Sequence, residues 1–404
     1  MTYDVIIAGG GAAGFFAAIQ IAQQDPSLHL VILEKGKDVL NKVRISGGGR
    51  CNVTHAEFIP NELARNYPRG ERELRGPFHT FCSGDTVDFF EKRGVPLKTE
   101  EDGRMFPVSD SSESIINCFR EECRKLGIEV ITNCGVNQVL EFEKYWELDT
   151  AGGTFRSRKL LLATGSSQKV WRMLSKMGIT IVDPVPSLFT FNIKDPRIQG
   201  LMGLSSFAGV RIPEAAIEAE GPVLITHWGL SGPAILRLSA WGARALNALN
   251  YHFKIHVNWM YPENRESCLE LLREEMEANP KRTVFRSKTF DLPKRLWQSL
   301  VEASGIDRSL KWADLSRKQM NRLVDELTDC VMDVHGKSTF KEEFVTAGGI
   351  DLKEVDFKTF ESRKFSGLYF AGEILNIDAI TGGFNFQNAW TGAYIAAKAI
   401  AQAP

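Results

Sequence analysis

The first thirty-five residues contain the feature that most constrains the fold. A mostly apolar run at 3–8 leads directly into Gly9-Gly10-Gly11-Ala12-Ala13-Gly14, and small and apolar residues follow over 15–24. A second apolar run at 28–33 ends in Glu34, twenty positions after the last glycine. This order predicts a βαβ unit that binds a dinucleotide: a strand, a glycine turn, a helix and a second strand that ends in an acid.

Each residue type in this pattern has a physical role. Gly9 permits the tight turn, Gly11 lets backbone N–H groups approach a pyrophosphate, and Gly14 lets the helix pack closely on the strand. The diphosphate then lies at the positive end of the helix dipole. Glu34 can accept hydrogen bonds from an adenosine ribose, whereas a 2′-phosphate at this place would meet like charge. The pattern therefore favours FAD or NAD over NADP, and the alternative is a βαβ unit that binds nothing.

The composition narrows the class of protein. A chain of 404 residues, 43% apolar and 25% charged, is typical of a globular protein with two or three domains. The formal net charge of −1 disfavours nucleic acid as a partner. The sequence has no signal-peptide pattern, and no stretch approaches the ~18 apolar residues of a membrane span. Because seven cysteines without paired spacing fit a reducing compartment, we expect a cytoplasmic protein without membrane contact.

Two further motifs suit a bound dinucleotide. In the run Ser46-Gly47-Gly48-Gly49-Arg50-Cys51-Asn52, three glycines beside an arginine and an asparagine make a flexible, donor-rich backbone surface. This surface suits a phosphate or the edge of a flavin ring, and the alternative is a plain surface turn. Residues 159–166 predict a buried parallel strand that ends in the small-residue turn Ala163-Thr164-Gly165. Such a turn lets the backbone pass close to the ligand.

The segments around these motifs carry weaker signals. The stretch 62–75 is charged and is predicted to be solvated, and 103–107 is predicted to be a loop that returns toward the site. Helical spacing predicts helices at 85–93 and 112–126, with Ser111 or Ser112 as the N-cap of the second. Apolar runs predict a strand at 128–132 and a small meander at 136–142 with 146–148.

The composition changes after Pro184 and Pro186. Short β-like segments with glycine turns fill 188–257, and the motif at 226–233 leads into a helix predicted over 234–249. Amphipathic helices are predicted at 263–277 and 316–327. We therefore expect an inserted β unit that carries a helical subdomain.

The last sixty residues return to the opening pattern. A strand predicted over 367–373 ends in Gly372 and Glu373, and a glycine pair at 382–383 comes before a small-residue helix over 388–402. The positive end of this second helix is expected to face the same crevice. It suits the electron-rich pyrimidine edge of a reduced flavin ring, which backbone donors of Gly383, Phe384 and Asn385 would meet.

These motifs give the chain a resemblance to a known family. The opening fingerprint and residues 45–52, 103–107, 160–166, 226–233 and 367–390 together resemble the BaiN and aminoacetone-oxidase family of NAD(P)/FAD-dependent oxidoreductases, which are flavoproteins of the two-dinucleotide type. The resemblance runs nearly the whole chain. It implies an α/β fold with non-covalent FAD. The implied domains are a discontinuous Rossmann-like FAD-binding domain at 1–188 and 346–404, a β-barrel-like insert at 189–260 and 331–345, and a helical subdomain at 261–330.

The chain departs from the family pattern at two places. Thr54-His55 stands where the family usually has Thr-Asn, and Asn376-Ile377-Asp378-Ala379 stands where it generally has Asp-Val-Asp-Gly. Both places are expected to meet the substrate or the flavin edge. The FAD motifs themselves are intact.

The fingerprint and the resemblance together define the expected cofactor site. The glycine turn would hold the pyrophosphate and Glu34 the ribose, and similar flavoproteins imply backbone near Val136 at the adenine edge and Glu373 near the ribityl chain or pyrophosphate. The full expected set is Gly9, Gly11, Ala12, Ala13, Gly14, Glu34, Lys35, Lys42, Ser46, Gly47, Gly48, Arg50, Cys51, Asn52, Val136, Ala163, Thr164, Gly165, Gly372, Glu373, Gly383, Phe384 and Asn385.

Two residues are candidates for catalysis. His227 suits proton transfer because an imidazole titrates near neutral pH, and the alternative is that it caps the helix that follows. Cys51 could be a redox thiol beside the flavin, and the alternative is a small residue packed under the ring. No cluster of histidine, cysteine and acidic residues has metal-ligand spacing, so no metal is expected.

These features predict an FAD-dependent oxidoreductase. A hydride would pass through flavin N5 between a small organic substrate and either NAD(P)H or oxygen. Only one glycine fingerprint is present, so any nicotinamide would bind transiently. The alternative is an FAD-binding RNA-modifying or regulatory protein, which the near-zero net charge disfavours. The oligomeric state is not readable from the sequence.

Overall fold

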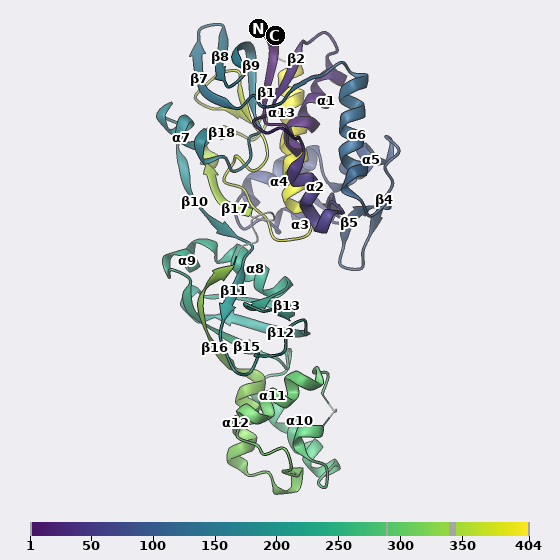
Figure 1. The fold of residues 1–404 in the computed structure, drawn as a ribbon, viewed down its shortest axis with the longest axis vertical. Coiled ribbons are helices and arrows are strands. Elements are labelled where there is room, and N and C mark those ends of the chain that lie inside the picture. Colours follow the sequence, from purple (N-terminus) through teal and green to yellow (C-terminus); the bar gives the residue numbers. More distant parts are fainter. Residues whose placement is uncertain (1, 288–289, 339–344, 403–404) are drawn as a thin grey trace. The chain divides into compact units, whose positions relative to one another are not determined.

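The computed structural model describes residues 2–287, 290–338 and 345–402. These residues form two compact units, one from 2–185 with 345–402 and the other from 186–338 (Figure 1). Residues 339–344, which belong to the second piece of the expected barrel insert, lie outside the described residues. The first unit therefore contains both ends of the chain.

The first unit is built on a nine-stranded sheet. Its central strand, β1 (Thr2–Ala8), pairs in parallel with β2 (Leu30–Leu33) and with β9 (Gly153–Leu162). On the other side of β9 lies β20 (Leu368–Phe370), also in parallel. This confirms the predicted discontinuous Rossmann-like fold, because a late strand extends the sheet that the first strand begins. The remaining strands are β6 (Glu129–Ile131), β7 (Val136–Phe142), β8 (Tyr145–Thr150), β18 (Val355–Asp356) and β19 (Glu361–Ser362).

Helices α1 (Ala12–Gln24) and α13 (Phe384–Gln402) pack against each other in the first unit (Figure 1). Aromatic side chains fill the contact, with the ring centroids of Phe16 and Trp390 5.4 Å apart. α13 begins at Phe384, four residues before the predicted start, because the helix follows directly on the glycine pair. Next to α1 lies α6 (Ser112–Lys125), and the hydroxyl of Ser111 caps it, as predicted.

Two local predictions in the first unit are wrong. Residues 104–107 form strand β5 (Arg104–Pro107) rather than a loop, because the segment pairs with β3 (Thr54–His55) on one side and β4 (Leu97–Thr99) on the other. The stretch 62–75 is not simply solvated, since Leu63, Tyr67 and Leu74 are buried. The helices of this region are α2 (Asn41–Ile45), α3 (Pro60–Ala64), α4 (Glu71–Thr80) and α5 (Ser83–Glu91).

The second unit contains a closed six-stranded barrel, which confirms the predicted β-barrel-like insert. Its strands are antiparallel, and β12 alternates buried with exposed residues, as a half-buried strand does. In barrel order they are β11 (Thr190–Ile193), β14 (Gly229–Ser231), β13 (Ile217–Ile225), β12 (Ser205–Ile212), β15 (His252–Asn258) and β16 (Cys330–Ser338).

The helices of the second unit match the prediction in part. The helix predicted over 234–249 is two helices, α8 (Pro233–Trp241) and α9 (Ala243–Ala248), which divide at Gly242. The helical part contains α10 (Arg265–Ala278), α11 (Lys294–Ala303) and α12 (Arg317–Thr328), of which α11 was not predicted. In the described part of the chain, no helix combines the length and the apolar character that crossing a bilayer requires.

Two further strands form a small sheet of their own. β10 (Ile181–Ser187) and β17 (Val345–Ile350) pair with each other in a two-stranded sheet, and α7 (Gln168–Lys176) precedes them. The segment 345–350 is therefore a strand that the sequence patterns did not predict.

Candidate functional site

The glycine turn after β1 has no room for a side chain at two positions. Gly9 has φ +119°, and a Cβ added there would lie 2.3 Å from the carbonyl oxygen of Ala163. A Cβ added at Gly14 would lie 1.9 Å from the carbonyl oxygen of Gly9. Real Cβ atoms almost never approach another atom within 3.0 Å. These two glycines therefore allow β1, α1 and the end of β9 to approach one another this closely.

The remaining glycine of the fingerprint, Gly11, faces open space. A Cβ added at Gly11 would meet no atom within 4 Å, and no described side chain caps this end of α1. The first N–H groups of α1, including those of Ala12 and Ala13, have no intrahelical partner and can meet an anion. Beside the turn, Thr164 Oγ1 is buried without a hydrogen-bond partner among the described residues. An oxygen-rich ligand at this place would satisfy these groups.

Glu34 links the tip of β2 to the glycine turn. Its carboxylate accepts a hydrogen bond from the N–H of Gly10 at 2.8 Å and one from the N–H of Gly36 at 2.7 Å. Each carboxylate oxygen has two lone pairs, so ribose hydroxyls can still donate to Glu34. The acid thus holds the backbone of the turn in place as well as presenting an acceptor to a ligand.

The start of β7 lies beside the same acid. The backbone N–H of Cys134 donates to the carbonyl oxygen of Glu34 at 2.8 Å. A Cβ added at Gly135 would lie 2.9 Å from the Cβ of Lys35. Val136 follows immediately, so the residues expected at the adenosine end of the ligand lie on neighbouring backbone segments.

The residues expected near the diphosphate and ribityl chain converge from both ends of the chain. Lys42 of α2 forms an ion pair with Glu373, which follows β20. The Glu373 carboxylate would lie 3.7 Å from a Cβ added at Gly165. A Cβ added at Gly372 would lie 3.2 Å from the Cβ of Ala13. The ends of β9 and β20 therefore meet at the start of α1.

The glycine run forms a short turn with left-handed backbone. Gly47 and Gly48 have φ values of +56° and +67° inside a 3-10 turn over Ser46–Gly49. The hydroxyl of Ser46 donates to the carbonyl oxygen of Val43 at 2.9 Å, and its carbonyl oxygen accepts from the N–H of Cys51 at 3.0 Å. A Cβ added at Gly48 would meet nothing within 4 Å. The run is thus tied down at its ends and open in the middle.

Asn52 connects the glycine run to the start of α13. With its amide oriented to satisfy both groups, the oxygen accepts from the N–H of Gly383 at 3.0 Å and the nitrogen donates to the carbonyl oxygen of Thr54 at 3.0 Å. The Gly383 N–H is therefore already engaged. Phe384 accepts a hydrogen bond from the Tyr67 hydroxyl at its carbonyl oxygen, while the Asn385 side chain bonds the backbone before the glycine pair.

Cys51 is not set up as a reactive thiol. The side chain is fully buried and the backbone is left-handed, with φ +62°. Burial raises the pKa of its thiol to about 12, so the nucleophilic thiolate is strongly disfavoured at neutral pH. This environment argues against the redox interpretation and fits a small packed residue.

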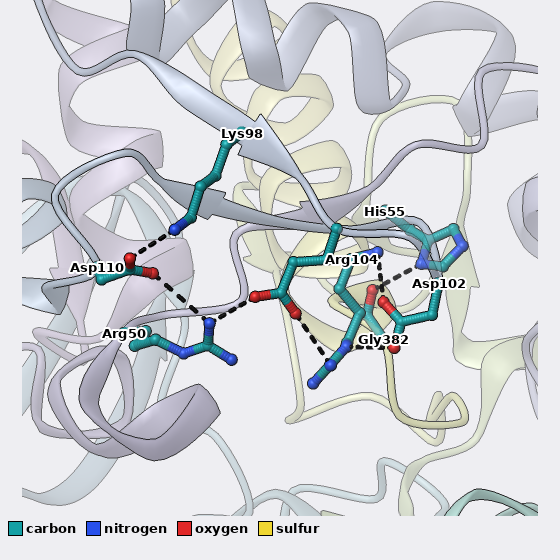
Figure 2. A network of polar contacts seen from close by, with 8 residues as sticks. Arg50, His55, Lys98, Asp102, Arg104, Asp110 and Gly382 are labelled. Carbon is teal, nitrogen blue, oxygen red and sulfur yellow. Dashed lines mark hydrogen bonds and ion pairs between the residues drawn. The ribbon is translucent and has the colours of Figure 1, made fainter. Parts of the chain in front are cut away.

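Arg50 lies in a chain of charges, and 33% of its side chain remains exposed (Figure 2). Its guanidinium lies 3.9 Å from the ring centroid of Phe106, and Nη1 is 2.5 Å from Glu100 Oε1 and 3.5 Å from Asp110 Oδ1. Lys98 pairs with the other side of Asp110. Sequence reasoning missed these partners because they lie fifty or more positions away, with no local spacing to indicate them.

His55, one of the two departures from the family pattern, lies beside the glycine pair. Its Nδ1 is 3.1 Å from the carbonyl oxygen of Gly382 (Figure 2). Its ring stacks on Phe384 with centroids 4.5 Å apart. Burial lowers the pKa of His55, so the imidazole is neutral at pH 7 and Nδ1 donates the proton of this hydrogen bond.

The second departure has a structural role. Asp378 is completely buried and forms a two-pronged ion pair with the guanidinium of Arg69. This pair joins the segment before α13 to the segment before α4. The departure from the family pattern was the only sequence signal that pointed to either His55 or Asp378.

His227 lies in the second unit, in the turn between β13 and β14, and its side chain is exposed. The alternative that it caps the following helix is wrong, because the N-cap of α8 is Gly232 and no described side chain caps that helix. Within the described ranges, no group of three or more histidine, cysteine, aspartate or glutamate residues is arranged to hold a metal ion.

The first unit fits FAD by its own geometry. The open space at Gly11, the uncapped end of α1 and the orphaned hydroxyl of Thr164 together form a cradle for a diphosphate. Glu34 supplies a ribose acceptor at one end, and the glycine run and the start of α13 supply backbone at the other. The donor set is thus that of a dinucleotide site.

Comparison with known proteins identifies related sequences along nearly the whole chain. The family model described as HI0933-like protein Rossmann domain matches residues 3–399. A protein of Escherichia coli (strain K12) named ribosomal RNA dihydrouridine synthase is 30% identical over 410 residues, covering 98% of this chain and 97% of its own. A protein of Clostridium scindens named 3-dehydro-bile acid delta(4,6)-reductase is 27% identical over 409 residues, with 98% and 99% coverage.

Solved structures with the same fold are more distant in sequence. A 3-ketosteroid-delta4-(5alpha)-dehydrogenase from Rhodococcus jostii RHA1 superposes with a TM-score of 0.55 at 13% identity, covering 100% of this chain and 97% of its own. The open form of a flavocytochrome c3 fumarate reductase gives 0.51 at 14% identity, with 99% and 78% coverage. These similarities support the fold alone.

Proposed function

Because the chain belongs to the HI0933-like family of FAD-binding Rossmann oxidoreductases, we propose that it is an FAD-dependent reductase of a carbon–carbon double bond conjugated to a carbonyl group. The observation that carries the proposal is the shared chemistry of two full-length relatives. One is named for reducing the 4,6-unsaturation of a 3-dehydro-bile acid, and the other for making dihydrouridine, which is uridine with its conjugated ring double bond saturated.

The proposed reaction adds two hydrogens to the substrate. A hydride goes to the carbon β to the carbonyl, a proton goes to the α carbon, and NAD(P)H is oxidised to NAD(P)⁺. FAD, when bound, supplies hydride transfer at its N5 atom. NAD(P)H would bind transiently, since the chain has one glycine fingerprint. If oxygen is the electron partner instead, the protein is an oxidase that takes the hydride from its organic substrate.

The chain's own residues bind and orient the cofactor in this proposal. The N–H groups at the start of α1 hold the diphosphate, and Glu34 accepts from the ribose. The glycine run and the N-terminal turn of α13 would line the ring of bound FAD, where the positive end of the helix dipole would favour negative charge. For the proton we propose His227, whose exposed imidazole can exchange protons with solvent.

A small organic substrate is the class we favour. The net charge is −1, and the helical segment 261–330 carries as many acidic as basic residues, so neither supplies the basic surface that RNA binding requires. RNA is the second candidate, because the relative that is 30% identical over nearly its whole length is named for ribosomal RNA. A cytoplasmic location is part of the proposal and is supported by seven free cysteines.

An anaerobic spectroscopic titration tests the proposal. The FAD-loaded protein is mixed with NADH or NADPH, and the flavin absorption bands are followed before and after a 3-oxo-Δ4,6 steroid acid or in-vitro-transcribed ribosomal RNA is added. Bleaching by one nicotinamide and recovery with the steroid supports the favoured reading, whereas recovery only with RNA supports the second. Bands that persist with both nicotinamides would eliminate the reductase and favour the oxidase.

A further inference from the structure

One nitrogen of the Arg50 guanidinium faces two carboxylates of the first unit, and its plane covers an aromatic ring. Its Nη1 lies 2.5 Å from Glu100 and 3.5 Å from Asp110, and the plane of the guanidinium covers the ring of Phe106 at 3.9 Å. Hydrogen bonding to Glu100 raises the pKa of Arg50, which keeps the guanidinium charged. An arginine side chain binds a diphosphate best when no carboxylate competes for it, and two carboxylates already face this one.

Phe106 transmits the position of Arg50 to the glycine run. A Cβ added at Gly47 would lie 3.0 Å from Cε1 of Phe106 and 3.0 Å from the N–H nitrogen of Asn52. The ring of Phe106 is completely buried. The aromatic side chain therefore contacts both the guanidinium of Arg50 and the first glycine of the run.

The turn that holds Arg50 also contacts the segment before α13. This turn, residues 100–103, closes with a hydrogen bond from the Gly103 N–H to the Glu100 carbonyl oxygen at 2.9 Å. A Cβ added at Gly103 would lie 2.5 Å from Nε2 of His55, whose Nδ1 bonds the carbonyl oxygen of Gly382. One turn thus pairs with Arg50 of the glycine run and contacts His55, and Figure 2 shows the polar contacts of these two side chains.

We propose that Glu100 and Arg50 are positioning residues: they brace the glycine run against the β4–β5 hairpin and so set where the flavin ring sits, without touching the cofactor. The inference rests on FAD as the cofactor in the proposed function. It does not depend on which substrate is reduced. Arg104 and Asp102 continue the same charge chain, with Arg104 Nη2 3.0 Å from Glu100 Oε2 and Arg104 Nε 2.7 Å from Asp102 Oδ2.

The effect of Glu100→Gln on FAD affinity separates bracing from direct binding. If Arg50 acts through the brace, the substitution loosens the glycine run, and the FAD dissociation constant rises about fivefold. If Arg50 instead bound the diphosphate, loss of its competing acid would free the guanidinium and lower the dissociation constant. Glu101→Gln is the matched control, because Glu101 is the exposed acid next in the chain, and it is expected to bind FAD as the wild type does.

A spectroscopic readout and a second pair of variants complete the test. The visible circular dichroism of bound FAD reports the surroundings of the ring, and it is expected to change in Glu100→Gln but not in Glu101→Gln. Arg50→Lys keeps the charge but loses the planar stack on Phe106, and should weaken FAD binding to a similar extent. Because both changes release the same brace, the double variant is expected to bind within about twofold of Arg50→Lys alone.

Three outcomes would overturn the inference: tighter FAD binding by Glu100→Gln, unchanged affinity and dichroism in both single variants, or fully additive losses in the double variant. If Glu100→Gln fails to fold, Phe106→Leu replaces it in the test. This variant keeps every charge and removes the aromatic ring, and it is expected to weaken FAD binding. The proposed function fails separately. If wild-type protein binds FAD but reduces no conjugated double bond, the reaction is wrong and the bracing role of Arg50 still stands.

Discussion

Gly14→Ala and Gly11→Ala add the same methyl group to two glycines of one turn. The first should lower the stability of the fold, and the second should weaken FAD binding. At Gly14 the new Cβ would lie 1.9 Å from the carbonyl oxygen of Gly9, so α1 and the turn have to separate by more than about 1 Å to restore contact distance. At Gly11 the new Cβ meets nothing within 4 Å. The first substitution therefore strains the fold, and the second only occupies the space that the cofactor requires.

The magnitudes follow from these two environments. Overpacking typically costs about 1–3 kcal/mol, and a backbone neighbour that cannot rotate away places Gly14→Ala at the upper end or above. Alanine regains about 1 kcal/mol through its helix propensity, so we expect a net loss of about 2–3 kcal/mol and a melting temperature lower by about 5–10 °C. For Gly11→Ala, a poorer N-cap and a less flexible unfolded chain offset each other within about 0.5 kcal/mol.

Thermal unfolding of the FAD-free protein, followed by circular dichroism, measures the first effect, and FAD titration measures the second. Gly11→Ala is expected to keep the wild-type melting temperature and to bind FAD at least about tenfold more weakly. The reasoning would be refuted if Gly14→Ala melted at the same temperature as Gly11→Ala, or if Gly11→Ala bound FAD as tightly as the wild type.

Three other changes give independent checks. Glu34→Ala removes the ribose acceptor and the carboxylate that holds Gly10, and is expected to raise the FAD dissociation constant at least about tenfold in equilibrium dialysis; flavin retention equal to wild type would contradict this. Stability of the FAD-free protein in urea should fall as pH rises from 9 toward 12, because the unfolded Cys51 thiol loses its proton near 9 and the folded one near 12. This thiol contributes up to about 1.4 kcal/mol per pH unit, and Cys51→Ala should flatten the slope by that amount. Asp378→Asn leaves the guanidinium of Arg69 facing a neutral amide, so the free energy of unfolding is expected to fall by ~3 kcal/mol. A fall smaller than about 1 kcal/mol in urea unfolding would show that the ion pair contributes little.

The parts of the molecule that were predictable are those written in local spacing. Gly9, Gly14 and Glu34 belong to a strand–turn–helix–strand unit whose successive elements are joined by short connections. The fold of that unit therefore follows from the order of residue types. The end of the strand predicted at 159–166 was predictable, because its buried residues 160–162 form an apolar run, whereas the observed strand β9 begins six residues earlier, at Gly153, and ends at Leu162. The closed barrel followed from the resemblance and from the short β-like segments at 188–257, although the sequence did not show how these strands pair.

The parts that were missed depend on pairing between distant segments. Residues 104–107 form a strand only because β3 and β4 lie on either side, and no property of Arg-Met-Phe-Pro by itself requires this. Arg50 was expected to face the cofactor, since an arginine beside glycines suits a phosphate. Its partners Glu100 and Asp110 come from another hairpin, and only the folded chain shows that they neutralise it.

The adjacency of β9 and β20 has a consequence for how this protein is made. Residues 160–162 pair with 368–370, and Asn52 meets Gly383, so the cofactor site needs segments that are synthesised after the barrel. The barrel unit at 186–338 is complete while this strand partner is still unsynthesised, and it can fold first as the chain emerges. During that interval the exposed edge of β9 is open to wrong pairings. Nascent chains halted before residue 368 should therefore hold a formed barrel but no flavin.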